Sequence, residues 1–187
     1  MIYQTNFSKN LGVQHTIGMD REGRQIAIID KNLKVLLDAT HFPLGNIRNS
    51  TLVERKSAGF NLPKIETLDS YIKEIFTGAR VIVYNAKAEI ANAPAWFQLA
   101  SEVICVMERA AHLGGKWNYQ HNSYEWITLT KAIETAGIEK PVGFPHHAVA
   151  DARATMLLWH FLEERDNRLA EQHFPERLTR VTNSGRS

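Results

Sequence analysis

The sequence predicts an α/β domain with a mixed central sheet, in which a three-stranded antiparallel meander and parallel strands are flanked by helices. Two observations support this fold class. Residues 13–42 hold apolar, β-branched runs separated by short polar turns, a pattern typical of a meander. Beyond Pro63, helical periodicity alternates with short apolar runs. The resulting order of elements is β-β-β-α-β-α-α-α, which indicates an α/β protein with a mixed sheet.

The strands of the meander are predicted from their apolar runs and from the turns between them. Residues 25–30 form a short strand rich in isoleucine, and after a polar turn residues 35–42 form the next strand. Residues 20–23 are polar and end in a glycine, which is typical of a tight turn. We therefore expect the first strand to end near Gly18 or Met19. Residues 43–58 are polar and irregular.

The first helix is predicted from apolar residues on one face, followed by a glycine at position 78 as its stop. The residues of this face are Ile65, Leu68, Ile72, Ile75 and Phe76. Residues 80–85 then form a short apolar run typical of a buried central strand. Residues 86–93 begin a helix that is interrupted at Pro94.

The C-terminal half is predicted to be mainly helical. Residues 101–113 open as a strand and continue as a helix, or are helical throughout; periodicity leaves both open. Ser123 is suited to cap a helix that runs through Ala136. The last long helix spans about 148–172.

Length and composition indicate one soluble domain. The 187 residues suit a single domain, expected to cover 1–165, with the end of the last helix and a flexible tail at 166–187. The single cysteine, Cys105, excludes an internal disulfide and a cysteine-rich zinc cluster. The start of the chain is unlike a signal peptide and no run is long enough to span a bilayer, so we expect a cytoplasmic protein without membrane contact. The net charge of +2 lacks the basic excess of a dedicated duplex binder.

Three stretches in order resemble a known enzyme family. Residues 25–43 resemble two strands of that family, residues 81–90 resemble its middle motif "(H/Y)NAxFD", and residues 146–155 resemble its last motif, a histidine followed five positions later by an aspartate. The family is the DEDDh branch of the DnaQ-like, ribonuclease H-like 3′–5′ exonucleases. The resemblance covers about residues 13–165 and implies a ribonuclease H-like exonuclease fold.

The resemblance also implies a catalytic site. Family members hydrolyse a phosphodiester with two divalent metal ions, magnesium or manganese, held by four carboxylates. Two carboxylates come from a D-x-E on the first strand, and the middle and last motifs supply one each. His146 corresponds to the general base and Asp151 to a metal ligand, whereas Glu89 occupies the place of the middle aspartate. The implied substrate contacts are Tyr84 and Asn85.

The first motif is where the sequence departs from the family. Aligned without gaps, D-x-E-T-x-G falls on residues 13–18, so that Val13 and His15 stand in the two acid positions. A gapped alternative places Gln4 and Asn6 there. Asp20-Arg21-Glu22 has the D-x-E spelling but is predicted to form the hairpin turn. The remaining cluster is then His15, Glu89, His146 and Asp151, a degenerate site that would hold one softer metal ion or none.

Three functions follow from this pattern. The first is a catalytically impaired homologue, or pseudoenzyme, that needs no cofactor and binds nucleic-acid 3′ ends or acts as a regulatory protein. The second is an active but divergent metal-dependent 3′–5′ exonuclease on single-stranded DNA or RNA, with Mg²⁺ or Mn²⁺ as cofactor, that uses Glu89, Asp151 and His146 with a further acid such as Asp20 or Glu22. The third is an interaction module with a protein partner. Trp117 lies in the loop best suited to contact a strand, and a homodimer is left open.

Overall fold

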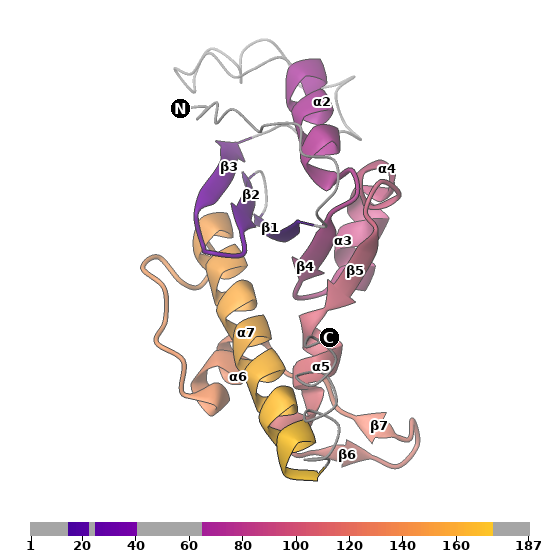
Figure 1. Ribbon diagram of the computed structural model, residues 1–187, viewed down its shortest axis with the longest axis vertical. Coiled ribbons are helices and arrows are strands. Elements are labelled where there is room, and N and C mark those ends of the chain that lie inside the picture. The colour runs from indigo at the N-terminus through magenta and orange to yellow at the C-terminus, as the bar shows by residue number, and fades with distance from the viewer. Residues whose placement is uncertain (1–14, 23–24, 41–64, 174–187) are drawn as a thin grey trace, which may run out of the picture.

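A five-stranded sheet with the order β3-β2-β1-β4-β5 forms the centre of the molecule. The computed structural model describes residues 15–22, 25–40 and 65–173 (Figure 1). The sheet is mixed, because β2 runs antiparallel to both β1 and β3 whereas β4 runs parallel to β1 and β5. This confirms the predicted α/β class, with a meander and parallel strands in one sheet. The strands are β1 (Thr16–Glu22), β2 (Gln25–Asp30), β3 (Val35–Thr40), β4 (Arg80–Val83) and β5 (Glu102–Cys105).

The helices lie largely where periodicity predicts them. The interruption at Pro94 separates two helices, and the stretch from residue 101 does open as a strand and continue as a helix. Residues 43–58, predicted to be irregular, fall outside the described residues, as do the side chains of Ile65 and Leu68. The helices are α2 (Ile65–Phe76), α3 (Ala86–Asn92), α4 (Pro94–Phe97), α5 (Val106–Ala110), the 3₁₀ helix η1 (Ala111–Gly114), α6 (Leu129–Ala136) and α7 (Ala148–His173).

The helix predicted to begin at Ser123 is wrong at its start. Ser123 lies in β7 (Ser123–Tyr124), which pairs with β6 (Trp117–Asn118) as a small hairpin. The rings of Trp117 and Tyr124 pack edge to face across this hairpin, with centroids 5.0 Å apart. Helix α6 instead begins at Leu129, where Thr128 accepts a hydrogen bond from the amide of Lys131. The hydroxyl that caps α6 therefore belongs to Thr128, directly before the helix, and not to Ser123.

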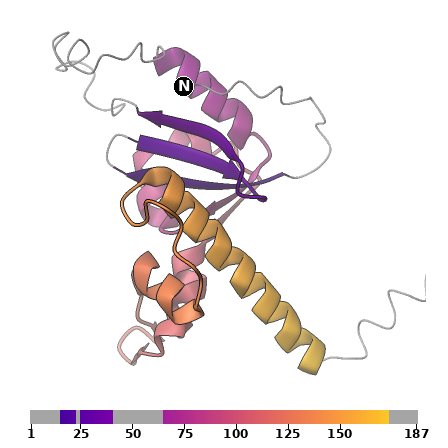
Figure 2. The same cartoon turned by 90° about the vertical axis from the view of Figure 1, so that its left-hand side faces the viewer.

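Helices lie on both faces of the sheet (Figure 2), and each face has its own cluster of buried apolar residues. On one face, α2 and α4 pack through Phe76, Trp96 and Phe97 against alternate residues of β1 and β2, such as Met19 and Ile28. On the other face lies α7, with α5 and α6 beside it. Its buried residues include Met156, Leu158 and Leu162. Among the helices of the described residues, none combines the length and apolar character that a membrane crossing requires.

Gly18 in β1 allows α7 to approach the sheet closely. A Cβ atom at this position would lie 2.9 Å from Cε of Met156 and 3.1 Å from Cγ1 of Ile29, closer than ordinary packing allows. Helix α7 therefore packs closely against β1, with Met156 over Gly18. This packing decides which side chains of β1 can meet the start of α7.

Candidate metal centre

Strand β1 extends further than the sequence analysis predicted, and it carries two acidic residues at its end. The strand reaches Glu22, where Asp20 pairs with Ala27 and Glu22 pairs with Gln25. The expected end near Gly18 or Met19 and the assignment of residues 20–22 to a turn are therefore wrong. Because Glu22 pairs with Gln25, the antiparallel pairing of β1 and β2 continues to the last residue of β1.

The alternation of β1 directs the two acids toward α7. Side chains two positions apart share a face of a strand, so Asp20 and Glu22 lie on the same face as Gly18. Gly18 faces Met156 of α7. Arg21 lies on the opposite face. The acids of β1 therefore meet the helix that carries Asp151.

Asp151 lies in the first turn of α7, and its side chain is buried. Its Oδ2 accepts a hydrogen bond of 3.1 Å from the backbone amide of His146. His146 has a positive φ of 73°, which is uncommon for a residue other than glycine. The other oxygen, Oδ1, is buried and has no hydrogen-bond partner among the residues that the structure describes. Burial comes first among the causes that raise the pKa of Asp151 above its ordinary value.

Three side chains converge at this point. Glu22, His146 and Asp151 each offer a ligand atom, and these atoms all lie within 4.8 Å of one another. Nδ1 of His146 lies 3.6 Å from Oε1 of Glu22, and the histidine side chain is 79% exposed. A buried carboxylate, a half-exposed carboxylate and an exposed imidazole thus share one site at the end of β1.

Asp20 lies among the other carboxylates. Its pKa is raised from 3.8 to about 8, first by burial and then by the negative charges of Asp151, Glu89 and Glu22, while Arg21 acts in the opposite direction. Its Oδ2 is buried without a hydrogen-bond partner in the described part of the chain. The negative charges of the other three carboxylates therefore all disfavour ionisation of Asp20.

Glu89 approaches from helix α3, which follows β4. Asn85 caps this helix by accepting a hydrogen bond from the amide of Ala88, and Glu89 lies in the first turn. Oε2 of Glu89 accepts a hydrogen bond of 3.1 Å from Nε of Arg21, and the side chains are 14% and 16% exposed. Burial raises the pKa of Glu89, and Arg21 only partly offsets this effect.

The donor set fits a hard divalent cation. Mg²⁺ and Mn²⁺ bind carboxylate oxygens, and burying carboxylates without a countercharge is costly. Two buried oxygens, Oδ2 of Asp20 and Oδ1 of Asp151, have no protein donor among the described residues, although folding has removed them from water. A cation at Glu22, His146 and Asp151, whose ligand atoms lie within 4.8 Å of one another, would bring positive charge to Asp151 and to Asp20 on the same face of β1. His146 adds an imidazole at the solvent side of the same group.

His15 does not belong to this cluster. It lies immediately before β1, at the opposite end of that strand from Glu22, and its Nε2 lies 2.7 Å from the carbonyl oxygen of Ile75. Seven residues of extended chain separate it from Glu22 by roughly 20 Å. The predicted cluster of His15 with Glu89, His146 and Asp151 is therefore wrong in including His15. The other proposed positions of the first motif, Val13, Gln4 and Asn6, lie outside the described residues.

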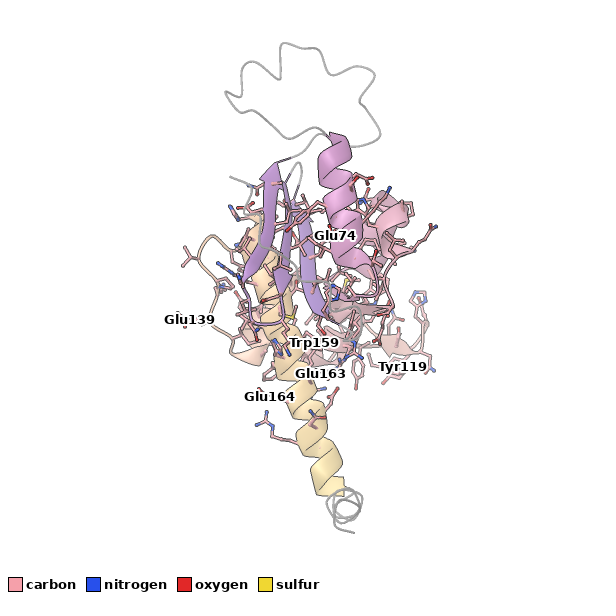
Figure 3. All side chains as sticks on the ribbon, turned by 45° about the horizontal axis from the view of Figure 1, so that its top comes forward. Glu74, Tyr119, Glu139, Trp159, Glu163 and Glu164 are labelled. Carbon is pink, nitrogen blue, oxygen red and sulfur yellow. The ribbon has the colours of Figure 1, made fainter. Side chains whose placement is uncertain are left out.

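The predicted substrate contacts have structural partners. The Tyr84 hydroxyl donates a hydrogen bond of 2.7 Å to the carbonyl oxygen of Ile127, and Asn85 caps α3. Trp117 lies in the β6–β7 hairpin, where Tyr119 is 89% exposed. Figure 3 shows Tyr119 projecting at the edge of the molecule, beyond α7 and its Trp159. Contact of these residues with a substrate stays a prediction.

The residues that the sequence predicted to lie in a turn, and that the structure places in a strand beside Asp151, are Asp20 and Glu22. The sequence holds two signals for them, the D-x-E spelling itself and the alternation of Ile17 and Met19 with Gly18 and Asp20. The polar composition of residues 20–23 outweighed both signals, because polar residues with a glycine are typical of turns. A strand that ends in a metal-binding group has the same composition.

Comparison with known proteins adds no family to this description. A scan against protein-family models finds no match for the chain, and a search of curated proteins finds none either. The geometry of the acidic residues therefore carries the functional argument.

Proposed function

We propose that this protein is a divergent metal-dependent 3′–5′ exonuclease that acts on single-stranded DNA or RNA, with a ribonuclease H-like exonuclease fold. The observation that carries the proposal is the meeting of Asp20 and Glu22 on β1 with Asp151 on α7. The resemblance to DEDDh exonucleases requires a D-x-E on the first strand of the meander, and Asp20-Arg21-Glu22 provides one in strand conformation. After Glu22 the chain departs from D-x-E-T-x-G, because Gly23, Arg24 and Gln25 follow.

The expectation of a pseudoenzyme depended on the loss of the first motif. With Asp20 and Glu22 beside Asp151, the main reason for expecting inactivity no longer applies. The strand-binding and protein-binding alternatives remain outcomes of the test below.

Each residue has a role that its position supports. Asp20, Glu22 and Asp151 would hold the cation, and the backbone amide of His146 fixes the orientation of the Asp151 carboxylate. A bound divalent cation supplies charge stabilisation at the phosphoryl oxygens and lowers the pKa of water. The exposed imidazole of His146 accepts the proton of the attacking water and passes it to solvent. Oε1 of Glu22 lies 3.6 Å from Nδ1 of His146, within the distance of an ion pair once the imidazole has accepted this proton.

The activity is tested with a single-stranded oligonucleotide labelled at its 5′ end, incubated with the purified protein and Mg²⁺ or Mn²⁺. We expect stepwise shortening from the 3′ end that chelation stops. Asp151→Asn should abolish shortening. Glu164→Gln serves as the matched control, because Glu164 is an exposed acid on the same helix, roughly 20 Å further along α7.

The outcomes separate the candidate functions. Shortening by both the wild type and Glu164→Gln, but not by Asp151→Asn, supports the exonuclease. An intact strand with every variant and both metal ions contradicts it. Retention of the intact strand on the protein at low salt would then favour a pseudoenzyme, and the absence of binding would favour an interaction module.

A further inference from the structure

Arg21 places a permanent positive charge beside Glu89, one of the four carboxylates. It is the middle residue of Asp20-Arg21-Glu22, so its side chain leaves β1 on the face opposite to the two acids. There it donates a hydrogen bond of 3.1 Å from Nε to Oε2 of Glu89. Both side chains are largely removed from solvent, at 16% and 14% exposure. A partly buried pair of this kind is screened less by salt than a surface pair.

The pair divides the four carboxylates into two sets. Glu22 and Asp151 converge with His146 on the α7 side of the strand, within 4.8 Å. Glu89 lies with Arg21 on the α3 side. Asp20 lies on the same face of β1 as Glu22, and its buried Oδ2 has no hydrogen-bond partner in the described part of the chain. A cation between Asp20, Glu22 and Asp151 meets three carboxylates and no fixed positive side chain, whereas a cation between Asp20 and Glu89 meets the guanidinium.

The guanidinium is a poor neighbour for a second divalent ion. Arg stays protonated at any ordinary pH, and its charge would repel a cation that shares Glu89. The same guanidinium already supplies the positive charge that a second ion would bring to Glu89 and Asp20. An ion on this side would have to displace Arg21 from a carboxylate that is mostly buried with it.

We infer that the centre takes a single divalent ion on Asp20, Glu22 and Asp151, and that Arg21, paired with Glu89, occupies the place of a second ion. This inference rests on the proposed metal-dependent function and specifies its stoichiometry. Arg21 is a positioning residue in this account, because it acts through Glu89 and Asp20. The arrangement differs from the two-ion site that the family resemblance implies.

The test is a calorimetric titration of the full chain with Mn²⁺ at pH 8, read as the number of ions bound. We expect one ion for the wild type, one for Arg21→Lys, which keeps the charge, and two for Arg21→Gln, which removes it. Electron paramagnetic resonance gives an independent measure, since two neighbouring Mn²⁺ ions couple magnetically and one does not. Glu89→Gln should still bind one ion, because it leaves the three ligands and the Arg21 charge in place.

Each result bears on a different claim. Two ions on the wild type would overturn the inference while leaving metal-dependent function intact. One ion on both the wild type and Arg21→Gln would show that Arg21 is not what excludes the second. No ion on the folded wild type would contradict the proposed function itself. If Arg21→Gln fails to fold, Glu89→Gln decides, because loss of an ion on this variant means that Glu89 holds one.

Discussion

Acidic residues near the two ends of helix α7 differ in whether a basic side chain compensates their charge. At its C-terminal half, Glu163 and Asp166 both bind Arg109 of α5, and Asp166 also binds Arg165. Burial would raise the pKa of Asp166, but hydrogen bonds from Arg165 and Arg109 outweigh it and hold that pKa below its ordinary value. Figure 3 shows Glu163 on the part of α7 that extends beyond the sheet.

At the N-terminal end the balance is reversed. Burial and neighbouring carboxylates raise the pKa of Asp20, and burial raises that of Asp151, with too little positive charge nearby to compensate. The acids at the C-terminal half thus have their own cations within the chain, whereas the acids near the start of α7 include buried oxygens without a partner among the described residues, which is why we propose that they bind an added cation. Such perturbed groups are typical of functional sites.

The largest expected effect is on cleavage. Asp20→Asn keeps the size of the side chain but removes the central negative charge, so strand shortening should fall by about 10³-fold or more. Asp166→Asn, the corresponding change at the other end of α7, should leave the rate unchanged. The measurement is the initial rate of release of the 3′-terminal nucleotide. Equal rates for the two variants would remove the distinction between the two ends of the helix.

The next effect is a gain in stability of the metal-free protein. Between pH 4 and pH 8 the folded protein retains a proton on Asp20 that the unfolded chain releases, because the pKa is 3.8 ordinarily and about 8 in the fold. Stability from this group is therefore lost as the pH rises through that window. At pH 8 without metal, Asp20→Asn should be more stable than the wild type by about 1–3 kcal/mol.

The pH dependence provides the control for this effect. Below pH 4 Asp20 is protonated in both the folded and the unfolded state, so the difference should vanish there. Chemical denaturation at about pH 3 and at pH 8, with chelator present, measures both values. A variant that is less stable than the wild type at pH 8 would contradict the predicted burial of an uncompensated charge.

A smaller effect is expected where α7 crosses β1. Gly18→Ala places a methyl group 2.9 Å from Cε of Met156 and 3.1 Å from Cγ1 of Ile29. The end of the methionine can move, so the loss of stability should be modest, about 1–2 kcal/mol. Because α7 carries Asp151, Mn²⁺ affinity should fall as well. Normal stability with normal affinity would mean that the close approach does not position the site.

The smallest effect is expected at the ion pairs of the C-terminal half. Asp166→Asn removes one partly exposed partner of Arg109 and should destabilise the protein by at most about 1 kcal/mol. The loss should shrink at high salt, because exposed pairs are screened. Thermal unfolding at low and high ionic strength measures it. A loss independent of salt would indicate a packing role for Asp166 instead.

The fold was more predictable than the site because it depends on repeated signals. Strand β2 and helix α2 each show several apolar residues at a regular spacing, and one misleading residue cannot change their period. The proximity of His146 and Asp151 was predictable, because the two residues lie five positions apart at the start of one helix. The prediction of where β1 ends depended on a few polar residues, whose composition suits a turn and the acidic end of a strand equally well.

Contacts between distant segments could not be predicted from the sequence. The pairing of Arg21 with Glu89 joins residues 68 positions apart, and the place of His15 at the far end of β1 depends on where that strand begins. Both follow from strand register, which is set by pairing with β2 and β4 rather than by local composition. A one-residue slip would have moved Asp20 and Glu22 to the other face of the sheet.

Thermal unfolding at pH 8 with and without Mn²⁺ tests directly whether these carboxylates form a centre for a divalent cation, as we propose. Binding to the folded state alone raises the unfolding temperature. We predict that Mn²⁺ raises it for the wild type and for Glu164→Gln, and not for Asp20→Asn or Asp151→Asn. An equal response of all four proteins, or none from the wild type, would contradict the account.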